Sequence, residues 1–124
     1  MKPLHFIASS RDDLCEFPEE VRSEAGYALY LAQMGDKAEN ACPLLGFGGA
    51  KVLEVVINNE GNAYRAVYTV KLKYAVYVLH AFQKKSVKGI ATPKPDMDVI
   101  RSRLKAAEAH HELIYKESLK EKSR

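Results

Sequence analysis

The chain has 124 residues, a length that suits one domain with its own hydrophobic core. Apolar residues make up 47% and charged residues 28%, values that exclude a disordered or fibrous chain. No apolar run approaches membrane-spanning length and the N-terminus lacks a signal-peptide pattern, so we expect a cytoplasmic protein that needs no membrane. Cys15 and Cys42 lie alone without metal-ligand spacing, which favours reduced thiols over a disulfide.

The hydrophobic pattern predicts an α+β fold in a compact single domain covering residues 1–124. Apolar residues recur at helical spacing between Pro18 and Gly35, and the sequence NNEG at 58–61 predicts a hairpin turn. In chain order we expect a strand at 4–9, a helical turn capped by Ser9 or Ser10, a helix at 18–35 and a loop at 36–50. Strands at 52–57, 64–72 and 75–83 and a loop at 84–95 follow. The last element is a helix with Met97, Ile100, Leu104 and Ala107 on its apolar face. Residues from about 110 to 124 form a charged helical tail that can fray. The order predicts two N-terminal helices and a C-terminal helix around a small, mainly antiparallel central sheet.

Positive charge is concentrated on the expected strands and on the loop that follows them. Residues 51–94 hold eight lysines and arginines against two acidic residues, a net charge of +6. Residues 1–50 carry a net charge of −4, and residues 95–124 carry +1. Because strands hold side chains in fixed directions, this charge can build a site, and RNA is a natural polyanionic partner for it.

Three basic residues are candidates for catalysis: Arg65, His80 and Lys84. Alternation along the last strand predicts that one face carries Val76, Val78, His80, Phe82 and Lys84. The sequence permits Arg65 on the neighbouring strand to join that face, but it does not fix the register. RNA cleavage must deprotonate a 2′-hydroxyl, stabilise charge on the phosphorane and protonate the leaving 5′-oxygen. The arginine fork suits the phosphate, the histidine suits proton transfer, and the lysine suits charge stabilisation.

Further basic and aromatic residues are expected to bind RNA through phosphates or base stacking. They are Lys51, Tyr68, Lys71, Lys73, Phe82, Lys85, Lys88 and Lys94. No metal-ligand cluster or cofactor motif accompanies them, so we expect a metal-free mechanism. Each residue also has an ordinary structural role, since strand histidines and aromatics usually belong to the core and strand-end lysines discourage aggregation.

Together these segments resemble a known toxin family. The stretches that carry the resemblance, between about Leu4 and Ala109, are PEEVRSEAGYALYLAQMG, PLLGFGGAKVLEVV, AYRAVYTVK, AVYVLHAFQKKS and TPKPDMDVIRSRL. They look like the phage-related, HigB-like branch of the RelE/ParE/HigB toxin superfamily. The resemblance implies a RelE-like α+β fold, often with ribosome-dependent mRNA endonuclease activity, and a small helix-turn-helix antitoxin encoded alongside.

The resemblance also assigns roles to individual residues. Arg65 matches the strand arginine that binds the scissile phosphate, and His80 lies on the strand where nuclease members place catalytic residues. Lys84 and Lys85 match the basic strand end. Acidic Glu54 departs from the pattern, because many relatives carry a basic residue on that strand.

The sequence therefore predicts the toxin of a type II toxin–antitoxin module. We expect a ribosome-associated mRNA endoribonuclease that cleaves by metal-free 2′-hydroxyl attack, with mRNA, the ribosome and the antitoxin as partners. Two alternatives stay open: a ParE-like inhibitor that binds a topoisomerase without nuclease chemistry, and an inactive phage-derived RNA-binding protein. The basic and histidine content of the last two strands favours RNA.

Overall fold

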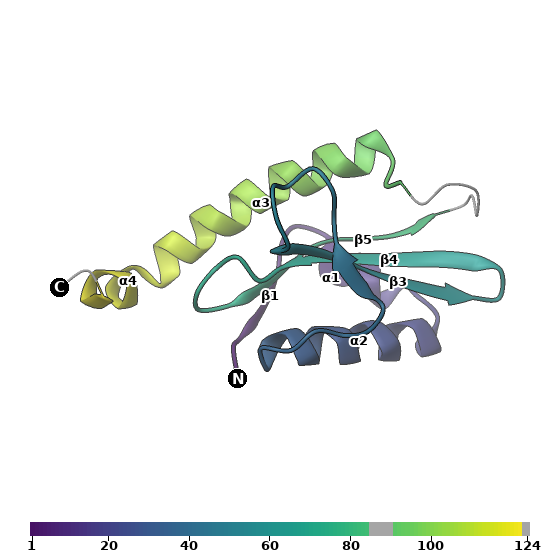
Figure 1. Cartoon of the computed structure of the whole chain (residues 1–124), viewed down its shortest axis with the longest axis horizontal. Coiled ribbons are helices and arrows are strands. Elements are labelled where there is room, and N and C mark those ends of the chain that lie inside the picture. Colours follow the sequence, from purple (N-terminus) through teal and green to yellow (C-terminus); the bar gives the residue numbers. More distant parts are fainter. Residues whose placement is uncertain (85–90, 123–124) are drawn as a thin grey trace.

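The computed structural model describes residues 1–84 and 91–122, and it confirms the α+β fold (Figure 1). The elements are β1 (Leu4–Phe6), α1 (Ser10–Cys15), α2 (Glu19–Gln33), β2 (Ala41–Pro43), β3 (Val52–Asn59), β4 (Asn62–Thr69), β5 (Val76–Lys84), α3 (Lys94–Ile114) and α4 (Lys116–Lys122). The strands form one sheet in the order β1-β5-β4-β3-β2. Only the β1–β5 pair is parallel among the pairs of this sheet, so the mainly antiparallel arrangement is as predicted.

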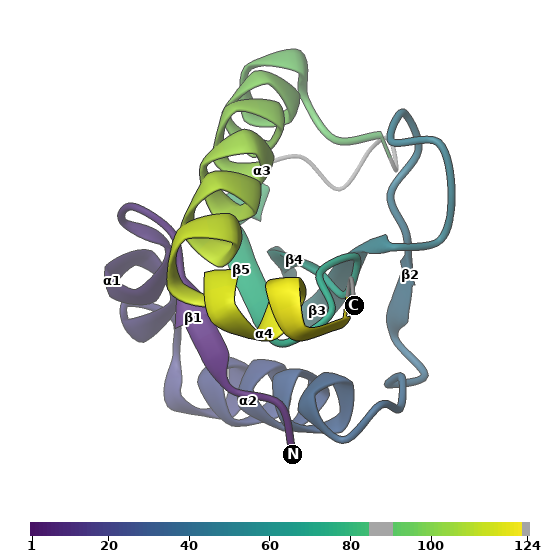
Figure 2. The ribbon, with the colours of Figure 1, turned by 90° about the vertical axis from the view of Figure 1, so that its left-hand side faces the viewer.

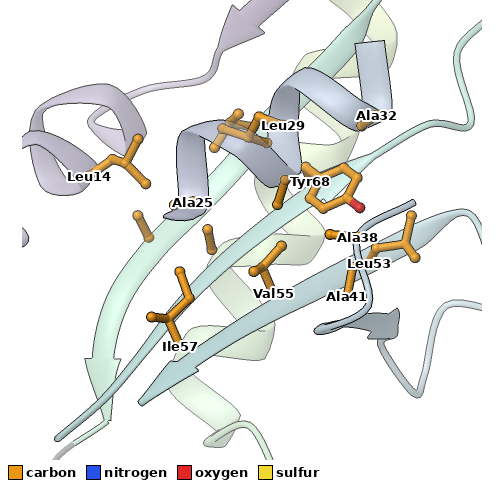
Figure 3. Packing of buried hydrophobic residues seen from close by; sticks show 14 of the residues in the cluster. Leu14, Ala25, Leu29, Ala32, Ala38, Ala41, Leu53, Val55, Ile57 and Tyr68 are labelled. Carbon is orange, nitrogen blue, oxygen red and sulfur yellow. The ribbon is translucent and has the colours of Figure 1, made fainter. Parts of the chain in front are cut away.

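Helices cover both faces of the sheet, with α2 on one face and α3 along the other (Figure 2). The side of α2 that faces the sheet is rich in alanine, which lets the helix approach the strands closely. Ala25, Leu29 and Ala32 pack there against Val55 and Tyr68 (Figure 3). Burying each large apolar side chain contributes about 1.5–3 kcal/mol, so this layer anchors the fold.

The opposite face of the sheet packs against α3. Ile100 and Ala107 are fully buried against Val67 and Leu79, which confirms the apolar face predicted for this helix. Pro93 precedes the helix and Pro95 lies in its first turn, where a missing N–H costs nothing. Among the described helices, none is both long and apolar enough to cross a membrane.

The predicted hairpin joins β3 to β4. Glu60 and Gly61 adopt φ angles of 50° and 82°, the left-handed pair of a type I′ turn. The expected loop at 36–50 differs in one respect, because Ala41–Pro43 pairs with β3 as a short edge strand. Three residues are too few to show a period, so the sequence carries no signal for it.

A β-bulge in β5 changes the faces that strict alternation predicts. His80 pairs with Val67, while Val78 pairs with the next residue, Tyr68, so Leu79 is the extra residue. Val78 therefore packs on the α2 side, whereas His80 points to the α3 side. The prediction that Val76, Val78, His80, Phe82 and Lys84 share one face is wrong, because only the last three lie on the α3 side.

Candidate active site

Three neighbouring strands bring a carboxylate, a guanidinium and an imidazole to the face that α3 covers. Glu54 on β3 and His80 on β5 both pair with Val67 of β4, and Arg65 lies two residues away from Val67 on β4. Residues two apart on a strand share a face, so Glu54, Arg65 and His80 point to the same side. The structure thus has the register that the predicted convergence of Arg65 and His80 requires.

Arg65 and Glu54 form a buried ion pair. Arg65 Nη1 donates to Glu54 Oε1 over 2.8 Å, and the two residues are only 4% and 5% exposed. Thr92 Oγ1 donates to Glu54 Oε2 over 2.8 Å and accepts a longer 3.4 Å bond from Arg65 Nη1. A buried charge needs such a partner, because desolvating an isolated ion is very costly. Glu54, a departure from the family pattern in the sequence, is therefore the direct partner of Arg65.

Two residues of α3 fix the His80 ring. Asp96 Oδ1 lies 2.8 Å from Nε2, and Arg103 Nη1 lies 3.4 Å from Nδ1. A guanidinium only donates, so Nδ1 accepts and the neutral ring carries its hydrogen on Nε2, directed at Asp96. Phe82 stacks on the imidazole with a centroid distance of 4.7 Å. The imidazole is thus held in one orientation, with the Asp96 carboxylate at Nε2.

Arg103 ties this site to the bulge in β5. Its Nη1 donates to the Leu79 carbonyl over 3.0 Å, and its Nη2 donates to Ser9 Oγ over 3.1 Å. Sequence reasoning missed Asp96, Arg103 and Thr92 as site residues. A signal existed for the first two, because residues seven apart lie on one side of a helix.

The other predicted catalytic residue, Lys84, ends β5 on the same face as Phe82. Its Nζ donates to the Ala91 carbonyl over 2.8 Å, which links the strand end to the segment before α3. Lys94 is exposed at the first position of α3. These two lysines lie at the same end of the sheet as Arg65, whereas Lys85 and Lys88 lie outside the described residues.

The remaining predicted RNA-binding lysines lie at the other end of the strands. Lys51 precedes β3, Lys71 forms a 3.3 Å ion pair with Glu108, and Lys73 lies over the Tyr74 ring. Six residues of β4 separate this end from the one bearing Lys84, about 20 Å at strand spacing. The structure therefore places the predicted lysines in two groups rather than in one patch.

Tyr68 has to be removed from the predicted site. It faces α2, is 0% exposed and packs in the larger hydrophobic core. Burial raises its pKa to about 12, so the phenol stays protonated. A ring enclosed in the core offers no face for base stacking.

A pocket of about 290 Å³ opens beside the buried ion pair. Glu54 and Thr92 line one part of it, and Cys42, Leu45 and Met97 line the rest together with Pro43, Leu44 and Ala91. The pocket gives a small group a route toward the Glu54 carboxylate. Within residues 1–84 and 91–122, no group of three or more His, Cys, Asp or Glu side chains is placed to hold a metal ion.

The paired histidines of the sequence lie at the far end of α3. His111 is 4% exposed, and its Nε2 accepts a hydrogen bond from the Tyr74 backbone over 3.1 Å. His110 Nδ1 lies 2.7 Å from the Tyr77 hydroxyl. Both residues hold the C-terminal half of α3 to β5 and to the segment that precedes it.

The free energy of unfolding is expected to fall as the pH drops from 7.5 to 5.5. Burial is the main cause that lowers the pKa of His111 below its ordinary 6.5; His110, His5 and Lys2 lower it further, against an opposing effect of Glu112. The unfolded chain then binds protons near pH 6.5 while the native chain does not, so acid favours unfolding. His111→Gln keeps an acceptor for the backbone and should flatten this dependence in denaturant titrations. An unchanged pH slope in that variant would contradict the assignment.

The fold and the site define a small α+β domain of the kind predicted for RelE-like toxins. Residues 12–105 match the family model described as phage derived protein Gp49-like (DUF891). The chain belongs to this family, a known family of RelE-like toxins. No curated protein matches the chain. The predicted toxin superfamily is confirmed at this level, and the finer HigB-like assignment stays a prediction.

Proposed function

We propose that this protein is the HigB-like toxin of a type II toxin–antitoxin module and cleaves mRNA on the ribosome. The observation that carries the proposal is the alignment of Glu54, Arg65 and His80 on three adjacent strands. Family membership supports a toxin with an antitoxin partner. The nuclease activity, the ribosome and mRNA are the parts that the proposal adds.

The three side chains match the three requirements of 2′-hydroxyl attack. Glu54 takes the 2′-hydroxyl proton, and the 2′-oxygen then bonds to phosphorus. Arg65 neutralises the charge that develops on the phosphorane. Asp96 and Arg103 engage both ring nitrogens of His80 in this conformation, so Arg103 must first release Nδ1, which then takes up a proton. The protonated His80 gives that proton from Nδ1 to the 5′-oxygen as the bond from phosphorus to that oxygen breaks. The products are a 2′,3′-cyclic phosphate and a 5′-hydroxyl, and Asp96 stabilises the imidazolium before transfer.

The substrate phosphate must replace the contacts that Thr92 makes with Arg65 and Glu54. The segment from Thr92 to Asp96 covers the ion pair and the His80 ring, so a phosphate reaches Arg65 only when this segment shifts. Binding energy from a large substrate can supply that change, because a ligand shifts a conformational equilibrium by its differential affinity. Ribosome-bound mRNA is a large anionic substrate, and Lys84 and Lys94 flank the site at this end.

One observation favours the ParE-like alternative. Glu54 neutralises Arg65 in a buried pair, and a guanidinium held in this way is less available to a phosphate. A toxin that poisons a topoisomerase through protein contacts would have no need to open this pair. The net charge of +6 on residues 51–94 favours RNA over that target.

Induced expression of the protein is expected to arrest growth and to shorten cellular mRNA within minutes. The physical reason is the presence of base, phosphate-binding and acid groups on one face of the sheet. The measurement is northern analysis and primer extension of abundant transcripts, with His80→Gln as the control because glutamine can keep both hydrogen bonds of the imidazole but cannot transfer a proton. Intact mRNA with altered DNA topology would support the topoisomerase reading instead, and growth without arrest would support the inactive RNA-binding protein.

A further inference from the structure

The side of α2 that faces solvent carries a row of large apolar side chains. Tyr27, Tyr30 and Met34 are 61%, 46% and 54% exposed. Their spacing of three and four residues places them on one side of the helix and its C-cap, and the two tyrosine rings stack at 6.5 Å between centroids. We call these three residues the α2 ridge. The helix buries its opposite side in the core, so the ridge contributes nothing to that packing.

A hollow of about 390 Å³ adjoins the α2 ridge. Tyr27 and Leu31 form its apolar wall, and the segment 37–40 forms the other side. Aromatic and methionine side chains beside a hollow are typical of the centres of protein–protein interfaces.

The charge around the α2 ridge indicates which partner fits. Residues 19–39, which comprise α2 and the segment beside the hollow, hold five acidic residues against Arg22 and Lys37, a net charge of −3. Glu24 and Glu20 are exposed on the same side of α2 as Tyr27, about one and two turns before it, respectively. This field repels RNA, and two copies docked through this face would bring like charges together. A basic protein surface is the complementary partner.

Gly26 adds an independent observation on the same helix. It lies inside α2, where glycine costs about 1 kcal/mol relative to alanine, and a Cβ there would meet nothing within 4 Å. No contact within the described chain requires the absence of a side chain at this position. A partner that approaches the helix backbone closely would require it.

We propose that the α2 ridge is the docking site of the antitoxin, which presents an apolar helix flanked by lysine or arginine. This inference rests on the proposed function for the identity of the partner. Helix α2 lies on one side of the sheet and α3 on the other (Figure 2), and Glu54, Arg65 and His80 point to the α3 side, so the α2 ridge and the site are on opposite sides. The antitoxin bound there leaves the site uncovered.

The test measures binding of the product of the adjacent reading frame to the purified toxin. The double variant Tyr27→Ser with Met34→Ser should raise the dissociation constant by at least about thirtyfold, as expected for loss of central anchors. The matched control is Leu113→Ser with Ile114→Ser, two exposed apolar residues on α3, which should bind within twofold of wild type. Growth arrest by the double variant expressed alone should persist and should no longer be relieved by the partner.

Two further variants separate the charge and backbone arguments. Glu20→Gln with Glu24→Gln should slow association and weaken its salt dependence. Gly26→Ala should raise the melting temperature of the isolated toxin and still weaken the complex. Binding of the α2 ridge variant within twofold of wild type overturns the inference, as does a wild-type toxin that does not bind the adjacent product. If the complex is tight and requires the α2 ridge but the toxin does not arrest growth, the docking site is supported and the toxic function is contradicted.

Discussion

Replacing Arg65 with lysine is expected to reduce mRNA cleavage by a factor on the order of ten to a thousand. The substitution keeps one positive charge beside Glu54, but a lysine ammonium cannot present the planar fork that bonds two phosphate oxygens at once. The loss should appear in the rate of single-turnover cleavage of ribosome-bound mRNA, with ribosome binding nearly unchanged.

Lysine is the informative replacement because the position is buried. Alanine would leave the Glu54 carboxylate without its counter-charge, at a cost of roughly 3–5 kcal/mol, and would confuse folding with catalysis. Arg101→Lys is the matched control, because Arg101 is an exposed arginine on α3 paired with Asp98. Near-normal cleavage by a folded Arg65→Lys variant would remove Arg65 from the mechanism.

The elements with a long periodic pattern of apolar residues, or with a specific turn sequence, were predictable. The helix α2 has a regular apolar side between a Pro-Glu-Glu start and Gly35, and Glu60-Gly61 has the turn chemistry that a hairpin requires. The bulge at Leu79 was not predictable, because alternating apolar residues look the same with or without one extra residue in the strand. That single residue decides which face His80 occupies.

The site was predicted only in part, because some of its residues owe their roles to contacts between elements that are distant in sequence. Arg65 and His80 stand out because basic residues inside apolar strands are uncommon. The role of Glu54 depends on a cross-strand neighbour, and that of Asp96 depends on a helix packed over the sheet, so both require the tertiary structure. Likewise, charge counted along the chain cannot reveal that Lys71 and Lys84 lie at opposite ends of the sheet.

The two faces of the molecule differ in charge and chemistry, and this separates two kinds of partner. The strands that bear Arg65 and His80 belong to the segment 51–94 with a net charge of +6, and α2 belongs to the segment 19–39 with a net charge of −3. A polyanion and a basic protein therefore have different places to bind on one small domain. Variants on one face should leave the function of the other intact.

His80→Gln is expected to lower cleavage by about a hundredfold or more while RNA or ribosome binding stays within a few-fold of wild type. A glutamine side chain can accept from Arg103 and donate to Asp96, so it preserves both contacts of the imidazole, but it cannot transfer a proton.

The control for His80 is His110→Gln, which removes a histidine at the far end of α3 and should leave cleavage per folded molecule unchanged. Binding, melting temperature and single-turnover cleavage have to be measured on the same preparation. A structural His80 gives the reverse result: the variant melts at a lower temperature and binds poorly, with little change in cleavage per folded molecule. We expect the catalytic result, because Asp96 and Arg103 orient the imidazole and Arg65 lies on the adjacent strand with its guanidinium on the same face.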